Sequence, residues 1–221
     1  MKPWFLNNPS MFVDFKNIIT KEYPGLELIN ENNVISLEGI IFLKKGSKIY
    51  DKYEVRIEIP CDFPKSVPLV WETGHRIPKD SSGNRHFNPA DGTACLFVPE
   101  ERYRFFPETG NIREFIENAV RPFFKSQTYY EKKGDWPFGQ LPHGHLGRLD
   151  FWADELGIDN NKSILKFLEY VIKKEIKGHW RCYCDSGKAL RDCHINKINE
   201  VKSKIPRNIL KKSYEELSQF I

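Results

Sequence analysis

Four potential metal ligands lie close together near the end of the chain, and they constrain its fold more than any other sequence feature. Cys182 and Cys184 are separated by one residue. A Cys193-His194 pair begins nine residues after Cys184, with Ser-Gly between to make a tight turn. Thiolate and imidazole donors in this number and spacing are what a closed tetrahedral Zn²⁺ site requires, with no position left for water or substrate. We therefore expect a structural zinc ion; buried thiols in a helical region are the alternative.

The charge of the chain divides into two regions. The net charge is +4, but residues 1–159 carry 20 basic and 23 acidic side chains, whereas residues 160–221 carry 14 and 7. We place a boundary near Asp159 and expect domains over residues 1–158 and 159–221. The basic region is able to neutralise phosphates. Its lysines are spread around a helix without interleaved exposed aromatic residues, so we expect a solvated face and no nucleic-acid partner.

The composition and the apolar pattern indicate the cellular compartment in which we expect the protein. A chain of 221 residues that is 40% hydrophobic is long enough for one or two globular domains. No apolar stretch is long enough to span a membrane, and the sequence enters polar Asn7-Asn8-Pro9 without the apolar region of a signal peptide. We expect a cytoplasmic protein without membrane partners. Thiols stay reduced there, so the five cysteines are not a disulfide framework.

The pattern of the first half predicts an α+β fold. Apolar spacing predicts an amphipathic helix over residues 10–23, capped by Asn8 or Ser10. Three β-rich runs follow, and strict alternation within the second is typical of an antiparallel strand with one buried face. Helices are expected farther on. The expected β-rich runs cover 26–43 (interrupted at 30–33), 50–59 and 67–72, and the later helices 112–124, 163–177 and 205–220.

An irregular segment from Thr73 to Gly110 carries a second kind of site. A stretch this long without periodicity inside a domain is usually functional. Within it, Cys95 follows His86 and Asn88 on what reads as a loop. A thiol presented in this way can act as a nucleophile, with an amide close enough to stabilise an oxyanion. On this segment alone, a cysteine beside Leu-Phe is more often a small buried apolar residue.

The order of these pieces resembles the ubiquitin-conjugating-enzyme family over residues 10–150. The matching pieces are Phe63-Pro64, His86-Phe87-Asn88 and Gly92-Thr93-Ala94-Cys95-Leu96. Three features depart from the family: Phe87 replaces a motif proline, Asn88 lies seven positions before Cys95 rather than eight, and residues 75–85 form an insertion. Together with Gly-Asp-Trp-Pro-Phe-Gly and Pro-His-Gly-His-Leu-Gly downstream, they look more like the bacterial branch associated with CBASS antiphage operons.

That resemblance implies a ubiquitin-conjugating-enzyme-like fold with a small zinc-binding helical appendage, and two successive acyl transfers. Cys95 would carry the C-terminus of a partner protein as a thioester and pass it to an amine. The partner implied is a cGAS/DncV-like nucleotidyltransferase, or another protein with a reactive C-terminus. Asn88 would stabilise the oxyanion. His86 would hold the loop through hydrogen bonds of its ring; use as a general base is the alternative.

Other polar residues of this region have open roles. His143 and His145 are candidates to fold over Cys95, or ordinary loop histidines. Asp135 would orient an incoming lysine or lower its pKa, or cap a turn before Trp136. Cys61 follows an alternating strand and is the second candidate for the nucleophile.

The C-terminal cluster resembles the SEC-C zinc motif found at the end of SecA and appended to many bacterial proteins. The matching residues are Cys182, Cys184, Ser186, Gly187, Lys188, Cys193 and His194, whereas Asp185 stands where the family more often has glycine. This resemblance implies zinc binding and protein docking. The competing functions are therefore a conjugating-type cysteine acyltransferase, a non-catalytic binding module of the same fold, and a zinc adaptor that recruits a partner.

Overall fold

The chain divides into two compact units in the computed structural model, which describes residues 2–78, 85–137, 142 and 144–221. Unit 1 comprises residues 1–97 and 104–139, and unit 2 comprises residues 98–103 and 140–221. The expected boundary between residues 158 and 159 falls inside unit 2. The division comes earlier because the helix that precedes this point belongs to the core of unit 2: Trp152 is fully buried and donates its Nε1–H to Ser213 Oγ at 2.7 Å.

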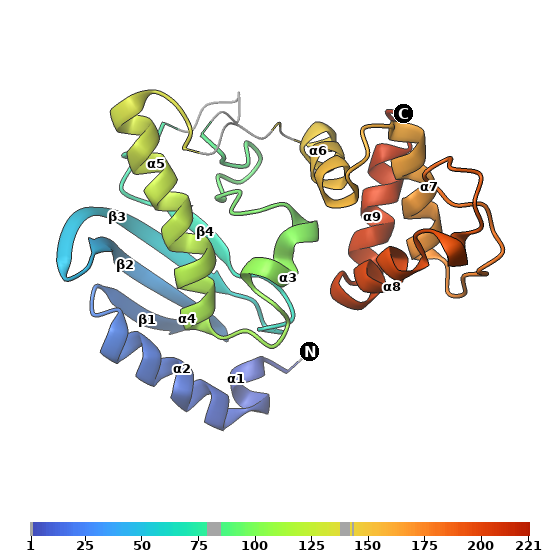
Figure 1. The fold of residues 1–221 in the computed structure, drawn as a ribbon. Coiled ribbons are helices and arrows are strands. Elements are labelled where there is room, and N and C mark those ends of the chain that lie inside the picture. Colours follow the sequence, from blue (N-terminus) through green and yellow to red (C-terminus); the bar gives the residue numbers. More distant parts are fainter. Residues whose placement is uncertain (1, 79–84, 138–141, 143) are drawn as a thin grey trace. The chain divides into compact units, whose positions relative to one another are not determined.

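A four-stranded antiparallel sheet forms the centre of unit 1 (Figure 1). Its order is β1-β2-β3-β4, so each strand pairs with the next along the chain. In β3 every second residue from Tyr53 to Ile59 is buried, as the alternation predicts, and the residues between them are largely exposed. The expectation of an α+β fold with an antiparallel meander is confirmed. The strands are β1 (Leu26–Glu31), β2 (Val34–Lys45), β3 (Lys48–Ile59) and β4 (Leu69–Glu72).

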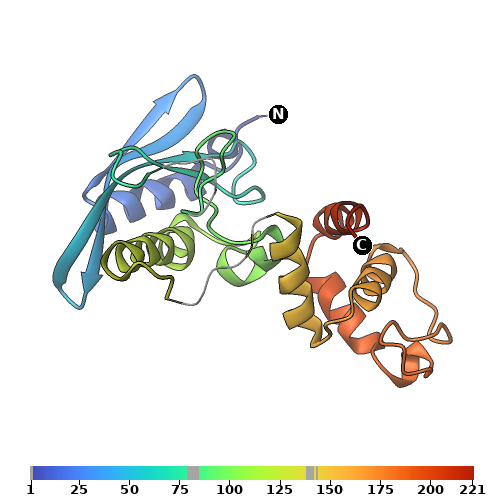
Figure 2. The same cartoon turned by 90° about the horizontal axis from the view of Figure 1, so that it is seen from above.

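Helices cover the buried face of this sheet. The short α1 (Trp4–Asn7) precedes α2 (Pro9–Glu22), whose first turn is capped by Asn8: Oδ1 accepts the Met11 N–H at 3.2 Å. A continuous helical stretch consists of α4 (Ile112–Phe115), a π-helical turn (Ile116–Val120) and α5 (Arg121–Lys133). α5 lies across the sheet in both views (Figures 1 and 2). It continues nine residues beyond the expected end at Phe124, up to Gly134 with φ +74°.

Unit 2 is a small helical unit with its own apolar core. Its elements are α6 (His145–Leu156), α7 (Asn161–Ile172), a 3-10 turn (Leu190–Asp192), α8 (Ile195–Lys204) and α9 (Arg207–Leu217). α7 ends earlier than expected, and Lys202 Nζ donates to the Lys173 carbonyl at its end at 2.6 Å. α6 and α8 are helices that the sequence pattern did not predict.

The segment between the two parts of unit 1 belongs to unit 2. A 3-10 turn (Pro99–Glu101) and α3 (Arg102–Phe105) begin there. Glu100 is fully buried, and its Oε1 lies 2.9 Å from Arg148 Nη1 on α6. Arg148 Nε lies 3.1 Å from Glu216 Oε2 on α9. None of the helices among the described residues has the length and apolar character needed to cross a bilayer.

Candidate functional site

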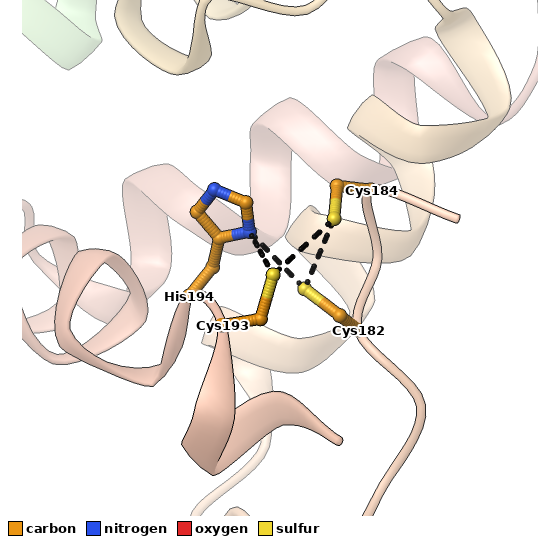
Figure 3. A group of neighbouring side chains, drawn as sticks. All are labelled: Cys182, Cys184, Cys193 and His194. Carbon is orange, nitrogen blue, oxygen red and sulfur yellow. Dashed lines mark hydrogen bonds between the residues drawn. The ribbon is translucent and has the colours of Figure 1, made fainter. Parts of the chain in front are cut away.

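The four cysteine and histidine ligands predicted from the sequence converge in unit 2 (Figure 3). Their ligand atoms all lie within 4.8 Å of one another. Cys184 Sγ is 3.5 Å from Cys182 Sγ and 3.6 Å from Cys193 Sγ. His194 turns Nδ1 toward the thiols, 3.2 Å from Cys182 Sγ and 3.1 Å from Cys193 Sγ. The group therefore offers one nitrogen and three sulfur donors around a common point.

A short hairpin presents Cys182 and Cys184, and the 3-10 turn that follows it leads to Cys193 and His194. Cys182 N–H donates to the Lys188 carbonyl at 2.9 Å, and Arg181 pairs with Ala189 in an isolated antiparallel bridge. The turn between them uses two left-handed residues, Asp185 at φ +58° and Gly187 at φ +75°. Asp is among the few non-glycine residues that adopt this conformation readily. This explains how Asp185 occupies a position where the similar zinc motif more often has glycine.

The donor set fits a tetrahedral metal ion. A Zn–S bond of about 2.3 Å places two thiolates of a tetrahedral site about 3.8 Å apart. The S···S separations of 3.5 and 3.6 Å are close to this spacing. Burial raises the pKa of Cys182, whereas for Cys184 hydrogen bonds led by that of Ser186 outweigh burial and lower the pKa. Cys182, Cys184, Cys193 and His194 are able to hold a metal ion, and the set is compatible with zinc.

The second candidate site lies in unit 1, on a short hairpin that presents Cys95. Phe87 and Ala94 form an antiparallel bridge, which places His86 opposite Cys95 in the register. Cys95 N–H donates to the His86 carbonyl at 2.8 Å, and Asn88 N–H donates to the Thr93 carbonyl at 2.7 Å. The three sequence-predicted residues His86, Asn88 and Cys95 therefore belong to one hairpin.

The hairpin is anchored to the core by its other face. Phe87 is 4% exposed and its ring meets that of Phe123 edge-on at 5.4 Å. Phe87 thus fastens the hairpin to α5. Ala94 N–H also donates to the Val70 carbonyl on β4 at 2.7 Å. The ring of His86 packs edge-on against Trp136 at 4.7 Å.

Cys95 lies at the surface, and its surroundings raise the pKa of its thiol. The residue is exposed. Atoms around the sulfur nevertheless desolvate it in part, and this burial, followed by the negative charge of Asp91, raises the pKa of Cys95. Asp91 is itself fixed, because its Oδ1 accepts both the backbone N–H and the hydroxyl of Thr93, at 2.9 and 2.7 Å. At neutral pH the thiol form predominates.

Asn88 has a defined side-chain orientation. Its Oδ1 accepts the backbone N–H of Ala90 at 3.2 Å, within the turn of the hairpin. With the oxygen used in this way, the Nδ2–H₂ group is the part of the amide that is able to donate to an oxyanion. Aspartate and asparagine side chains that accept a hydrogen bond from the backbone of their own turn are typical of loops with a fixed geometry.

The remaining sequence candidates have other surroundings. Cys61 is exposed, and its carbonyl accepts the Trp4 N–H at 2.9 Å. Asp135 Oδ1 accepts the Trp136 N–H at 2.8 Å, which is the turn-capping role offered as its alternative. His145 stacks on Phe220 at 3.8 Å within unit 2. His143 lies outside the described residues.

Two residues near the hairpin escaped the sequence reading. Arg85 and Gln127 are hydrogen-bonded to each other across 42 positions. The sequence feature that could have revealed them is Gln127, a polar residue at an inward position of α5 where the helical pattern predicts an apolar side chain.

Comparison with known proteins assigns no family to this chain. No protein-family model matches it, and no curated protein matches it significantly.

Proposed function

We propose that the protein is a conjugating-type cysteine acyltransferase of ubiquitin-conjugating-enzyme-like fold, with Cys95 as its acyl carrier. The observation that carries the proposal is the hairpin in which an exposed Cys95 is hydrogen-bonded opposite His86, with Asn88 oriented in the same turn. The helix-then-meander order of unit 1 supports it. A cGAS/DncV-like nucleotidyltransferase, in antiphage defence, is the partner that the sequence resemblance implies.

The chemistry consists of two acyl transfers. The Cys95 thiolate attacks the carbonyl carbon of an activated acyl donor, a thioester or acyl adenylate, and the donor's leaving group departs as the new C–S bond forms. An amine then attacks the Cys95 thioester, loses a proton to solvent, and expels the thiolate as the amide forms. The attack of the amine passes through a tetrahedral oxyanion, toward which Asn88 Nδ2 is the assigned donor.

A raised thiol pKa suits a carrier more than a protease. A thiol of higher pKa is a poorer leaving group, so its thioester resists attack by water for longer. Burial and Asp91 raise the pKa of Cys95, whereas a hydrolytic cysteine works with a lowered one. A carrier must retain its acyl group as a thioester until an amine acceptor arrives.

The test uses the full chain and a peptide α-thioester as donor. Without reductant, wild-type protein should gain the peptide mass on Cys95 and lose it again with dithiothreitol. Cys95→Ala should abolish the adduct, Cys95→Ser should give an oxyester that dithiothreitol leaves intact, and Cys61→Ala is the matched control that should behave as wild type. An adduct that survives Cys95→Ala and disappears with Cys61→Ala would show that the nucleophile is misassigned.

The role of Asn88 has its own readout. Loading of the peptide and its discharge to free lysine are measured separately by intact mass. Asn88→Ala should slow discharge by about 10²-fold, the usual effect of removing one oxyanion donor, with loading affected less. Equal losses in both steps would contradict the oxyanion role. A wild-type chain that binds the peptide but gains no acyl group would instead support the binding module.

We propose further that the four-ligand group in unit 2 holds a structural Zn²⁺ ion. Four protein donors complete a tetrahedral shell, so the ion supplies folding energy and no open catalytic position. Elemental analysis of the purified chain should find one zinc per molecule, and Cys193→Ser should lower this content. Full zinc content in the Cys193→Ser chain would contradict the ligand assignment.

A further inference from the structure

Gln127 is a buried polar residue on the inward face of α5. Its side chain is fully buried and lies one turn beyond Phe123 and Phe124, which pack in the core of unit 1. Buried polar groups are stable only when their hydrogen bonds are made. The oxygen and the nitrogen of the Gln127 amide both form hydrogen bonds, and both bonds are made to the same residue.

That residue is Arg85. Gln127 Nε2 donates to the Arg85 backbone carbonyl at 2.7 Å, and Gln127 Oε1 accepts from Arg85 Nε at 3.1 Å. The guanidinium also lies 4.7 Å from the centre of the Tyr130 ring, one turn farther along α5. The side chain and the main chain of Arg85 are therefore both held by the helix.

Arg85 immediately precedes the hairpin of Cys95. The next residue is His86, with φ +55°, whose carbonyl accepts the Cys95 N–H at 2.8 Å. We propose that Gln127 is a positioning residue: by clamping Arg85 it fixes the His86–Cys95 pairing and so the place of the thiol. The role in acyl transfer rests on the proposed function, whereas the clamp itself is tested on the thiol alone.

A neighbouring residue of the same helix supplies a matched control. Thr128 is also buried, and its Oγ1 lies 2.9 Å from Tyr53 Oη and 2.7 Å from Asp51 Oδ2. Thr128→Val removes buried hydrogen bonds from α5 without touching Arg85. General weakening of the unit should therefore appear in this variant, whereas loosening of the hairpin should not.

The experiment measures how accessible Cys95 is in the full-length chain. Iodoacetamide alkylation of Cys95 is followed by peptide mass spectrometry, and exchange of the Cys95 amide by NMR. In Gln127→Leu both rates should rise by about threefold to tenfold, the value of one net hydrogen bond, while peptide transfer falls. A thiol that reacts faster with a small reagent but transfers acyl groups more slowly is the signature of misplacement. Thr128→Val should leave both rates within about twofold of wild type, less than one net hydrogen bond.

A second variant keeps the test decisive if Gln127→Leu fails to fold. Gln127→Glu retains an acceptor for Arg85 Nε but loses the donor to the Arg85 carbonyl, so an intermediate increase in amide exchange is expected. Equal effects of the Gln127 and Thr128 variants, or no change at Cys95 in either Gln127 variant, would overturn the positioning role. A wild-type chain that never accepts the peptide refutes the proposed function and leaves the alkylation result standing.

Discussion

The buried ion pair of unit 2 gives a sharp prediction about stability. Glu100 is 0% exposed and Arg148 is 6% exposed, and their charged atoms are 2.9 Å apart. Arg148→Met keeps an unbranched apolar side chain but leaves a carboxylate in the core without its cation. Removing one partner of a buried pair costs about 3–5 kcal/mol, because the remaining charge is uncompensated. We expect a loss of this size in the free energy of unfolding of unit 2.

Urea unfolding at pH 7, followed by circular dichroism, measures the loss, and the transition of unit 1 serves as an internal reference. Glu216→Gln is the matched control: it removes the other partner of Arg148, a carboxylate 37% exposed, and should cost less than about 1 kcal/mol. Adding Glu100→Gln to Arg148→Met should recover most of the stability, because a neutral amide replaces the buried charge.

The same variant has a defined pH dependence. Burial, opposed by Arg148, already raises the pKa of Glu100. Without Arg148 the pKa rises further, so the folded state binds a proton that the unfolded chain does not, and stability increases as the pH falls. The loss in free energy of unfolding caused by Arg148→Met should therefore be smaller at pH 5 than at pH 7. A loss below about 1 kcal/mol, under the cost of an uncompensated buried charge, or no recovery with Glu100→Gln, would refute the reasoning.

Three further outcomes are expected. Chelation of the metal with EDTA should lower the thermal midpoint of wild-type protein, and a chain carrying Cys193→Ser should no longer respond. Gly39→Ala should cost about 2–4 kcal/mol by urea unfolding, because a Cβ would lie 2.2 Å from the Gly25 carbonyl oxygen at φ +132°. The Arg76 hydrogen bonds lower the pKa of Asp51 to about 2. They should therefore contribute about 1–2 kcal/mol to the free energy of unfolding above pH 4, and this contribution should be lost between pH 4 and pH 2. An acid titration of the Asp51→Asn variant should lack this loss.

The parts of the fold that the sequence predicted are those determined locally. The antiparallel meander follows from alternation, because one face of the sheet is buried and the other is open, as along Tyr53–Ile59. The start of α2 follows from Asn8, whose cap is made within three residues. The four residues able to hold a metal ion were predicted together, since they lie within one short stretch of chain from Cys182 to His194.

The parts that were missed depend on distant partners. α5 continues past the expected end at Phe124 and includes Gln127 and Thr128, which interrupt the apolar pattern. Both are buried, and the residues that satisfy them, Arg85 and Asp51, come from other segments of unit 1. The boundary near Asp159 followed the change of charge, which reports on the surface and not on which helices share a core.

The assignment of residues 98–103 to unit 2 affects how the protein can be produced in parts. The chain leaves unit 1 after Phe97 and returns at Arg104, so no single cut separates the units. An expression clone ending at Gly139 would retain Glu100 without Arg148, and Val98 and Tyr103 without the apolar cluster against which they pack. Such a fragment is expected to aggregate. Residues 98–103 begin three residues after Cys95, so their misfolding in such a fragment could disturb Cys95 directly. Loss of activity in the fragment would therefore not show whether unit 2 takes part in the chemistry.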